Sequence, residues 1–209
     1  VYFHSELTGK GSDYHYNKWR MCSDKGIQLL SYFEDELNAS WPVIKAQIAE
    51  LIGKSTAKLM QAQDCVIDEI EYNCDAKDFI YANSIYDLPE YTTKVLAAYY
   101  LGRMIAILAF DEAPGCVNIV CYAHDIEYSV DGLLERFVSY YVTSYNFIGT
   151  VYAVSDNCHS NGEIYTQAGF VKHSEIQPDF MYYRVGQREA KSKYSLDKIA
   201  AQFDVEVNG

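Results

Sequence analysis

One stretch near the C-terminal end constrains the fold more than any other part of the chain. It covers residues 156–170 and continues into residues 178–184. The order of residue types predicts a strand end, a polar cap, a short helix and then new strands. Ser160 or Asn161 can cap the helix by accepting hydrogen bonds from its free N–H groups. Gly169 can end the helix with a positive φ.

The residues after that helix predict further strands. Phe170–Val171 and Phe180–Tyr183 are apolar and aromatic, and Pro178 predicts a turn between them. A strand, a helix with the pattern Y-x-x-x-G-F and a second strand resemble the closing half of a GNAT-type acetyltransferase fold. The resemblance places Tyr165 at the general-acid tyrosine of those enzymes, although a packing role is the alternative for this side chain.

The same stretch more closely resembles the C-terminal domain of phage homing endonucleases related to very-short-patch repair nucleases. That family has the ordered pattern S-N-G-x-x-Y-x-x-x-G-F, a spacer and P-x-Y-x-Y-V. This chain has SNGEIYTQAGF at residues 160–170 and PDFMYYRV at residues 178–185.

The N-terminal residues resemble the second half of the catalytic domain of the same nucleases. The matching segments are YFHSE at residues 2–6, YHYNK at 14–18, Cys22, and GIQLLSYFEDE at 26–36. The resemblance therefore covers most of the chain. It implies a β–loop–α–β–α order for residues 1–54, a partial restriction-endonuclease-like subdomain.

The expected elements of this subdomain follow from the residue pattern. Residues 14–25 predict a helix, and Ile27–Phe33 predicts a strand. Ser40 is expected to cap a second helix that has Pro42 in its first turn.

The resemblance also names candidate catalytic residues. His4 matches the active-site histidine of the nucleases, and Glu6, His15 and Lys18 complete the nuclease-motif remnant. The metal-binding carboxylates of those nucleases lie before the segment that corresponds to residues 2–6. We therefore expect no metal site and no cofactor, with Mg²⁺ bound only if a longer chain supplies the carboxylates. The acidic run at residues 34–36 is interpreted as a solvated or capping segment.

The rest of the chain is expected to form a mixed α/β (α+β) domain. Residues 55–64 are interpreted as a connector, 65–185 as a GNAT-like mixed-sheet domain, and 186–209 as a basic tail with a terminal helix. Alternating strand-like and helix-like segments give the order β-α-β-β-β-α-β-α-β-β, which is GNAT-like.

Acetyl-CoA is not expected to bind this domain. GNAT enzymes hold the pyrophosphate on a loop with the pattern Q/R-x-x-G-x-G/A at a helix N-terminus. The equivalent residues here run from Glu127 to Gly132, with Val130 in place of the first glycine and Asp131 beside the second. Two carboxylates facing a pyrophosphate would repel it by about 1 kcal/mol or more.

The charge of the chain limits its partners. The formal net charge is −12, and residues 55–209 carry 11 Lys+Arg against 22 Asp+Glu. Such acidity opposes broad, non-specific binding of the larger domain to DNA. The expected DNA contacts are basic side chains outside its core, namely Lys10, Arg184, Arg188, Lys191 and Lys193.

Cysteine usage and hydropathy predict a cytoplasmic chain without a membrane partner, and the resemblance to phage nucleases implies a bacterial host. The six cysteines form no C-x-x-C pair, and no apolar run is long enough to span a bilayer. Reduced thiols are typical of a cytosolic protein.

Three functions remain open from the sequence. The leading hypothesis is a phage-type homing-endonuclease relative that acts on or binds DNA and lacks a complete catalytic centre. The alternative is an acidic, catalytically silent interaction module that inhibits a basic DNA-binding protein. The third is a GNAT-type N-acetyltransferase.

Overall fold

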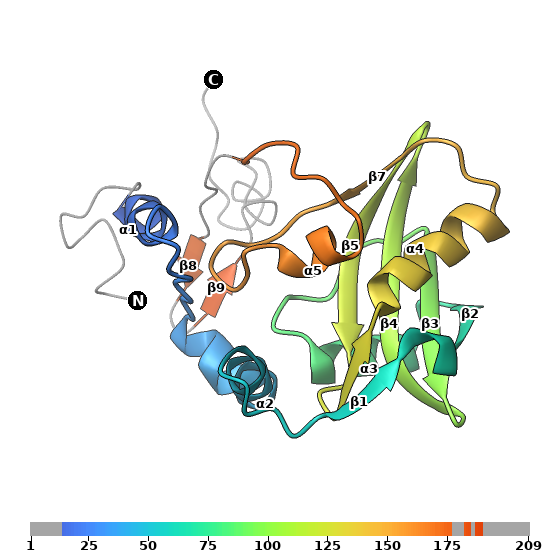
Figure 1. Cartoon of the computed structure of the whole chain (residues 1–209), viewed down its shortest axis with the longest axis horizontal. Helices are drawn as coiled ribbons and strands as arrows, with labels where there is room; N and C mark the ends of the chain where they lie inside the picture. The colour runs from blue at the N-terminus through green and yellow to red at the C-terminus, as the bar shows by residue number, and fades with distance from the viewer. Residues whose placement is uncertain (1–13, 177–181, 185–186, 190–209) are drawn as a thin grey trace, which may run out of the picture. The chain divides into compact units, whose positions relative to one another are not determined.

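The computed structural model describes residues 14–176, 182–184 and 187–189 (Figure 1). The described residues divide into two compact units. The larger unit comprises Gln28–Tyr32 and Glu36–Lys172, and the other described residues belong to the smaller one. This division differs from the boundary expected at residue 54, because most of the second helix belongs to the larger unit.

A five-stranded mixed sheet forms the centre of the larger unit. Its strands stand in the order β2-β3-β4-β5-β7, with antiparallel pairing from β2 to β5 and parallel pairing between β5 and β7. The bounds are β2 Val66–Ile70, β3 Lys94–Tyr100, β4 Arg103–Ala113, β5 Cys116–His124 and β7 Thr150–Ala153. The predicted mixed α/β fold class is confirmed.

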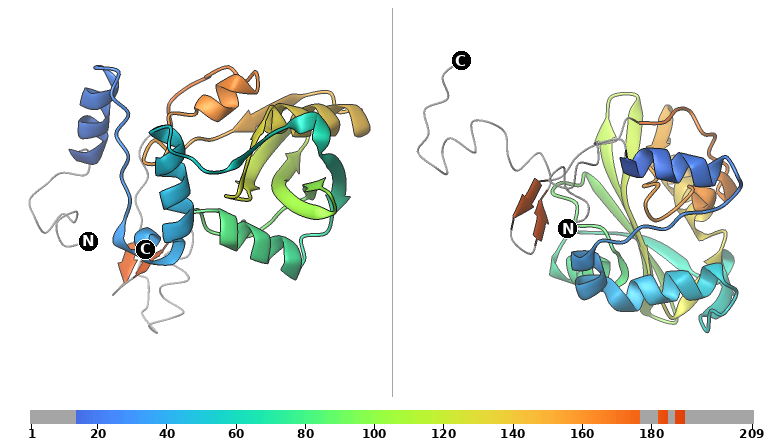
Figure 2. Two further views of the ribbon diagram at one scale, coloured as in Figure 1. Left: turned by 60° about the horizontal axis from the view of Figure 1, so that its bottom comes forward. Right: turned by 90° about the vertical axis from the view of Figure 1, so that its left-hand side faces the viewer.

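Two helices cover opposite faces of this sheet, as Figures 1 and 2 show. Helix α3 (Cys74–Asn83) packs Ala76 and Ile80 against one face. Helix α4 (Leu133–Ser144) packs Phe137 and Tyr141 against the other. Both faces of β3 and β4 are consequently buried, which explains their nearly continuous apolar sequences.

A small second sheet joins a strand that precedes β2 to a strand that lies between β5 and β7 in sequence. Strand β1 (Lys58–Gln61) pairs in parallel with β6 (Tyr128–Asp131), and a 3₁₀ turn, η3 (Ala62–Asp64), follows β1. The expected connector at residues 55–64 therefore contains a strand and a turn. Its single buried strand residue, Met60, belongs to the hydrophobic cluster beneath α4.

The expected strand at Ile27–Phe33 is wrong. No strand is assigned to residues 27–33, although the Ser31 N–H donates to the Cys158 carbonyl oxygen at 2.8 Å. The apolar pattern resembles a strand, but strand structure requires a neighbouring strand that satisfies the backbone groups in register. Residues 28–32 are hereafter called the strap.

The two helices that flank the strap differ in environment. Helix α1 (Tyr14–Ser23) has no buried residue, whereas α2 (Glu34–Leu51) buries Glu36 and Ile44. Helix α2 begins at the acidic run and bends at Ser40, whose φ of −124° and ψ of 26° are not helical. Ser40 thus marks a kink within one helix, and Pro42 follows in the first turn after it.

The stretch at residues 156–170 forms the predicted helix, but the strand predicted directly after this helix does not form. Two hydrogen bonds lie at the start of helix α5 (Glu163–Gln167). The Gly162 N–H donates to the Ser160 hydroxyl oxygen, and the Glu163 N–H donates to Asn161 Oδ1. Gly169 has a φ of 86°, as expected for a helix stop. Phe170 and Val171 form no strand; Phe170 packs on Tyr165 instead.

Two short strands, β8 (Tyr182–Arg184) and β9 (Gln187–Glu189), pair with each other in antiparallel orientation in the smaller unit. Across the described residues, no helix combines the length and apolar character needed to cross a membrane.

Candidate functional site

Strands β5 and β7 pair over a short length and then separate. This separation, hereafter called the parting, is the most distinctive feature of the larger unit. The two strands pair only from Cys116 to Ile119 on β5, which match Thr150 to Ala153 on β7. Among the strands that the structure describes, none pairs with the remainder of β5 on this side. Backbone N–H and C=O groups on an unpaired strand edge can bind an extended ligand.

A glycine fixes the closed end of this parting. The Thr150 N–H donates to the Gly115 carbonyl oxygen at 3.2 Å. A Cβ atom at Gly149 would stand 2.4 Å from the same oxygen and 2.7 Å from the ring of Phe147. Only glycine therefore lets the start of β7 approach the turn before β5 so closely.

Phenol groups gather near the open part of β5. Burial, followed by the influence of nearby Tyr165, raises the pKa of Tyr122. Burial and then the Cys121 thiol raise the pKa of Tyr165 on α5. Burial raises the pKa of Cys121 itself to about 12. These side chains therefore keep their protons at neutral pH.

Tyr165 has the packing role that was expected as the alternative, and its general-acid role stays a prediction. The Tyr165 ring packs edge-to-face on Phe170 with centroids 5.7 Å apart, and it contacts the cluster beneath α4.

A buried histidine forms a second centre that the sequence reasoning missed. The His159 side chain is 3% exposed, and its Nε2 lies 3.2 Å from Oε2 of Glu36 on α2. The imidazole stacks on Tyr32 with centroids 5.2 Å apart and meets Tyr86 edge-on at 5.5 Å. Its Nδ1 lies 3.6 Å from Oδ2 of Asp156.

Further hydrogen bonds attach this histidine segment to the strap and to α2. The Tyr32 hydroxyl donates to Gln47 Oε1 at 2.9 Å, and Gln47 Nε2 donates to the His159 carbonyl oxygen at 2.8 Å. Together with the bond from Ser31 to Cys158, these contacts hold the chain after β7 against α2. The Glu36–His159 pair thus fixes the open end of the strand parting.

Tyr86 borders the histidine centre. Its ring contacts His159, and 48% of the residue is exposed. Burial of its hydroxyl raises the pKa of Tyr86, and Asp156 and Tyr165 raise it further.

The loop expected to face a pyrophosphate contains a strand, and one of its two carboxylates is paired with a cation. Residues 128–131 form β6, and Gly132 precedes α4 in the left-handed conformation with a φ of 71°. Arg103 binds Asp125 at 2.6 Å and Glu127 at 2.9 Å. Glu127, the first acidic residue counted against a pyrophosphate, therefore has a cationic partner.

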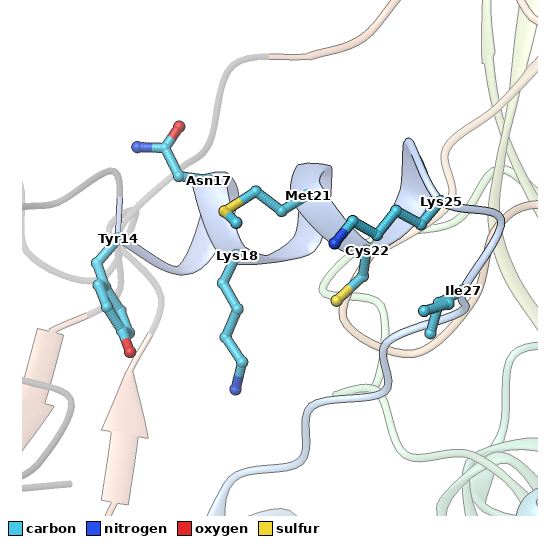
Figure 3. Close-up of a pocket in the computed structure, with 7 residues that line it drawn as sticks. All are labelled: Tyr14, Asn17, Lys18, Met21, Cys22, Lys25 and Ile27. Carbon is cyan, nitrogen blue, oxygen red and sulfur yellow. The ribbon is translucent and has the colours of Figure 1, made fainter.

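The nuclease-motif residues are only partly described. His15 and Lys18 lie on α1, where Lys18 lines an open hollow of about 410 Å³ (Figure 3). The other residues that line it are Tyr14, Asn17, Met21, Cys22, Lys25 and Ile27. His15 meets the Tyr14 ring edge-on at 5.2 Å. The structure does not test a nuclease role for His15 or Lys18.

Several predicted contacts lie outside the described side chains. His4, Glu6, Lys10, Lys191 and Lys193 are outside the described residues, while Arg184 and Arg188 belong to β8 and β9. Their roles stay predictions. In the part of the chain that the structure describes, no three His, Cys, Asp or Glu side chains come close enough to hold a metal ion.

Comparisons with known proteins add a likeness of fold. No family model matches the chain, and no curated protein matches its sequence. A solved aminoglycoside acetyltransferase from an uncultured soil metagenomic sample, in complex with sisomicin, is 11% identical with a TM-score of 0.43. Its complex with trehalose is 12% identical with the same TM-score; each covers 58% of this chain and 97% of that one.

The predicted mixed sheet is present in the larger unit, whereas the GNAT-like resemblance stays a prediction. None of the comparisons shows a relationship to very-short-patch nucleases, so that resemblance stays a prediction. A likeness of this size concerns the arrangement of helices and strands. The side chains of the site have to be judged by their own contacts.

Replacement of Tyr122 by phenylalanine should change how stability depends on pH. An unfolded tyrosine ionises near pH 10, whereas the folded Tyr122 keeps its proton to a higher pH. Its stabilising contribution is therefore complete below pH 10 and declines above it, by about 1.4 kcal/mol per pH unit. With Tyr122→Phe, the free energy of unfolding, measured with urea between pH 9 and 11, should therefore fall less steeply as the pH rises.

Tyr81→Phe is the matched control, because Tyr81 is 70% exposed. It should leave the slope of the unfolding free energy against pH unchanged. A Tyr122→Phe slope equal to that of the unsubstituted protein would show that Tyr122 ionises alike in both states.

Proposed function

We propose that the larger unit is an acyltransferase that binds an acyl thioester of coenzyme A along the open edge of β5 and transfers the acyl group to an amine. The observation that carries this proposal is the parting of β5 from β7 after Ile119, which leaves one edge of β5 unpaired among the described strands. The coenzyme's pantetheine arm contains amide groups, which can pair with an open strand edge.

The start of α4 provides a place for the coenzyme's phosphates. A helix N-terminus has free N–H groups and a positive end of the helix dipole. No side chain caps α4 at Gly132, and Arg103 compensates Asp125 and Glu127 in the preceding loop. Both carboxylates counted against a pyrophosphate, Glu127 and Asp131, are exposed, but Glu127 forms an ion pair with Arg103. This proposal departs from the expectation that acetyl-CoA does not bind.

The proposed reaction needs a proton donor for the leaving group. The amine nitrogen attacks the thioester carbonyl carbon, a C–N bond forms, and the C–S bond breaks. The departing thiolate takes a proton from the Tyr165 hydroxyl, and the amine releases a proton to solvent. Burial raises the pKa of Tyr165, so the phenol is protonated and able to donate at neutral pH.

Tyr165→Phe should separate coenzyme binding from acyl transfer. Removal of the hydroxyl leaves the ring packed on Phe170, so acetyl-CoA should bind with unchanged affinity in isothermal titration. The rate of acetyl transfer to an amine should fall about 100-fold, because general-acid assistance is lost. Release of free thiol, followed with a thiol-reactive dye, measures that rate.

Tyr152→Phe on β7 is the control, since Tyr152 is 45% exposed; its transfer rate should be unchanged. The proposal fails if acetyl-CoA shows no binding at millimolar concentration. Unchanged transfer by Tyr165→Phe would remove this residue from the mechanism and leave coenzyme binding standing.

DNA binding by the smaller unit is a second candidate function. Helix α1 buries no residue, and the described segment 14–27 carries Lys18, Arg20 and Lys25 against the single acidic residue Asp24. Tyr16 and Trp19 stack on this helix with centroids 5.9 Å apart. Basic side chains beside aromatic rings suit contact with nucleic-acid phosphates and bases.

The double variant Lys18→Ala/Lys25→Ala should weaken binding to a fluorescently labelled duplex at least tenfold in anisotropy titrations at 50 mM salt. The dependence of affinity on salt concentration should become shallower by about two counterions. Lys45→Ala, an exposed lysine of the larger unit, is the control. Equal DNA affinities for the unsubstituted protein, the double variant and Lys45→Ala would exclude α1 from DNA contact. Absence of both coenzyme binding and DNA binding in the unsubstituted protein would favour the silent interaction module.

A further inference from the structure

The hydrogen-bonding state of His159 follows from its neighbour Glu36. The side chains of both residues are buried, 3% and 8% exposed, and Nε2 lies 3.2 Å from the Glu36 carboxylate. With an ionised Glu36 carboxylate, which can only accept hydrogen bonds, the donor of this contact is Nε2, and Nε2 then carries the hydrogen. In the neutral imidazole the other nitrogen, Nδ1, is then an acceptor.

This second nitrogen lacks a donor. Nδ1 of His159 is buried and has no hydrogen-bond partner among the described residues. Asp156 Oδ2, which lies 3.6 Å from Nδ1, is itself an acceptor. Buried polar atoms in folded proteins nearly always have a partner, so a missing donor points to a ligand.

The Asp156 side chain makes this position reachable. Its Oδ1 accepts the Cys158 N–H at 2.8 Å, which orients the carboxylate and leaves Oδ2 beside His159. The Asp156 side chain is 46% exposed, whereas the imidazole is enclosed. A donor that approaches from solvent therefore meets Asp156 first, and a small displacement of this carboxylate would bring the donor to Nδ1.

The surroundings favour a positively charged donor. The Tyr86 ring borders the imidazole, and aromatic faces attract cations. The larger unit carries 8 Lys+Arg against 18 Asp+Glu, so its net charge is −10. No lysine or arginine of the described residues forms an ion pair with Asp156.

We infer that Asp156, His159 and Tyr86 bind the ammonium group of a primary or secondary amine. The ammonium N–H groups donate to Asp156 Oδ2 and to His159 Nδ1, and the Tyr86 ring contacts the charge. As the acceptor site for acyl transfer, the inference rests on the proposed function. Amine binding itself needs no coenzyme.

A matched pair of probes tests the donor requirement. Butylamine and butyltrimethylammonium carry the same charge, but only butylamine has N–H groups. NMR titrations that follow the ring protons of His159 should give a dissociation constant at least tenfold lower for butylamine. Asp156→Asn should weaken butylamine binding at least tenfold, whereas Glu163→Gln, on the exposed face of α5, should leave it unchanged.

Three results would overturn the inference: equal affinity for the two probes, unchanged butylamine binding by Asp156→Asn, or no His159 shift with butylamine. A parallel titration with acetyl-CoA separates the two proposals. Coenzyme binding without amine binding defeats the ammonium site alone. Amine binding without coenzyme binding supports the site and defeats the acyltransferase.

Discussion

The pairing and parting of β5 and β7 is the constraint on which the rest of the site depends. At one end, Gly149 allows the chain before β7 to approach the Gly115 carbonyl so closely that any side chain would collide with it. At the other end, the chain after β7 turns away to place His159 beside Glu36. Because both ends are fixed, the edge of β5 between them stays unpaired, and a ligand can use its backbone groups.

Buried polar contacts hold the chain after β7, at the end where β5 and β7 have separated. Hydrogen bonds and ion pairs fix the position of this segment more specifically than apolar contacts would. His159 lies between the rings of Tyr32 and Tyr86 and faces carboxylates at both nitrogens. Placing an imidazole between acidic groups in a poorly solvated position is costly unless its hydrogen bonds are satisfied. The strap, α2 and the segment after β7 all contribute to this centre, so it joins parts of the chain that are far apart in sequence.

The elements that depend on local pattern could be predicted from the sequence. The hairpin around Gly102, the apolar stripe of α4 and the helix stop at Gly169 follow from side-chain periodicity and glycine geometry. The strap at residues 28–32 has the pattern of a strand but no partner strand, and pattern alone cannot supply one. The parallel pairing of Lys58 with Tyr128 was missed for the same reason, since it joins segments seventy positions apart.

The candidate site was predicted only in part. A sequence motif draws attention to Tyr165, whose catalytic role stays a proposal, whereas Glu36 and His159 are separated by 123 positions. The available signals, an acidic run after an apolar segment and a histidine before a helix cap, have ordinary explanations as caps and solvated loops. Likewise, the acidity of Glu127 argued against phosphate binding until the structure placed Arg103 beside it.

Amide hydrogen exchange along β5 tests the central claim most directly. In the free protein, the amides from Val120 to His124 that face away from β4 should exchange faster than the corresponding amides from Val117 to Ile119, which lie beside β7. Saturating acetyl-CoA should slow exchange in the 120–124 segment and leave the 117–119 segment unchanged. Exchange at 120–124 that is already slow without ligand, or that does not respond to the coenzyme, would contradict an open strand edge as the binding site.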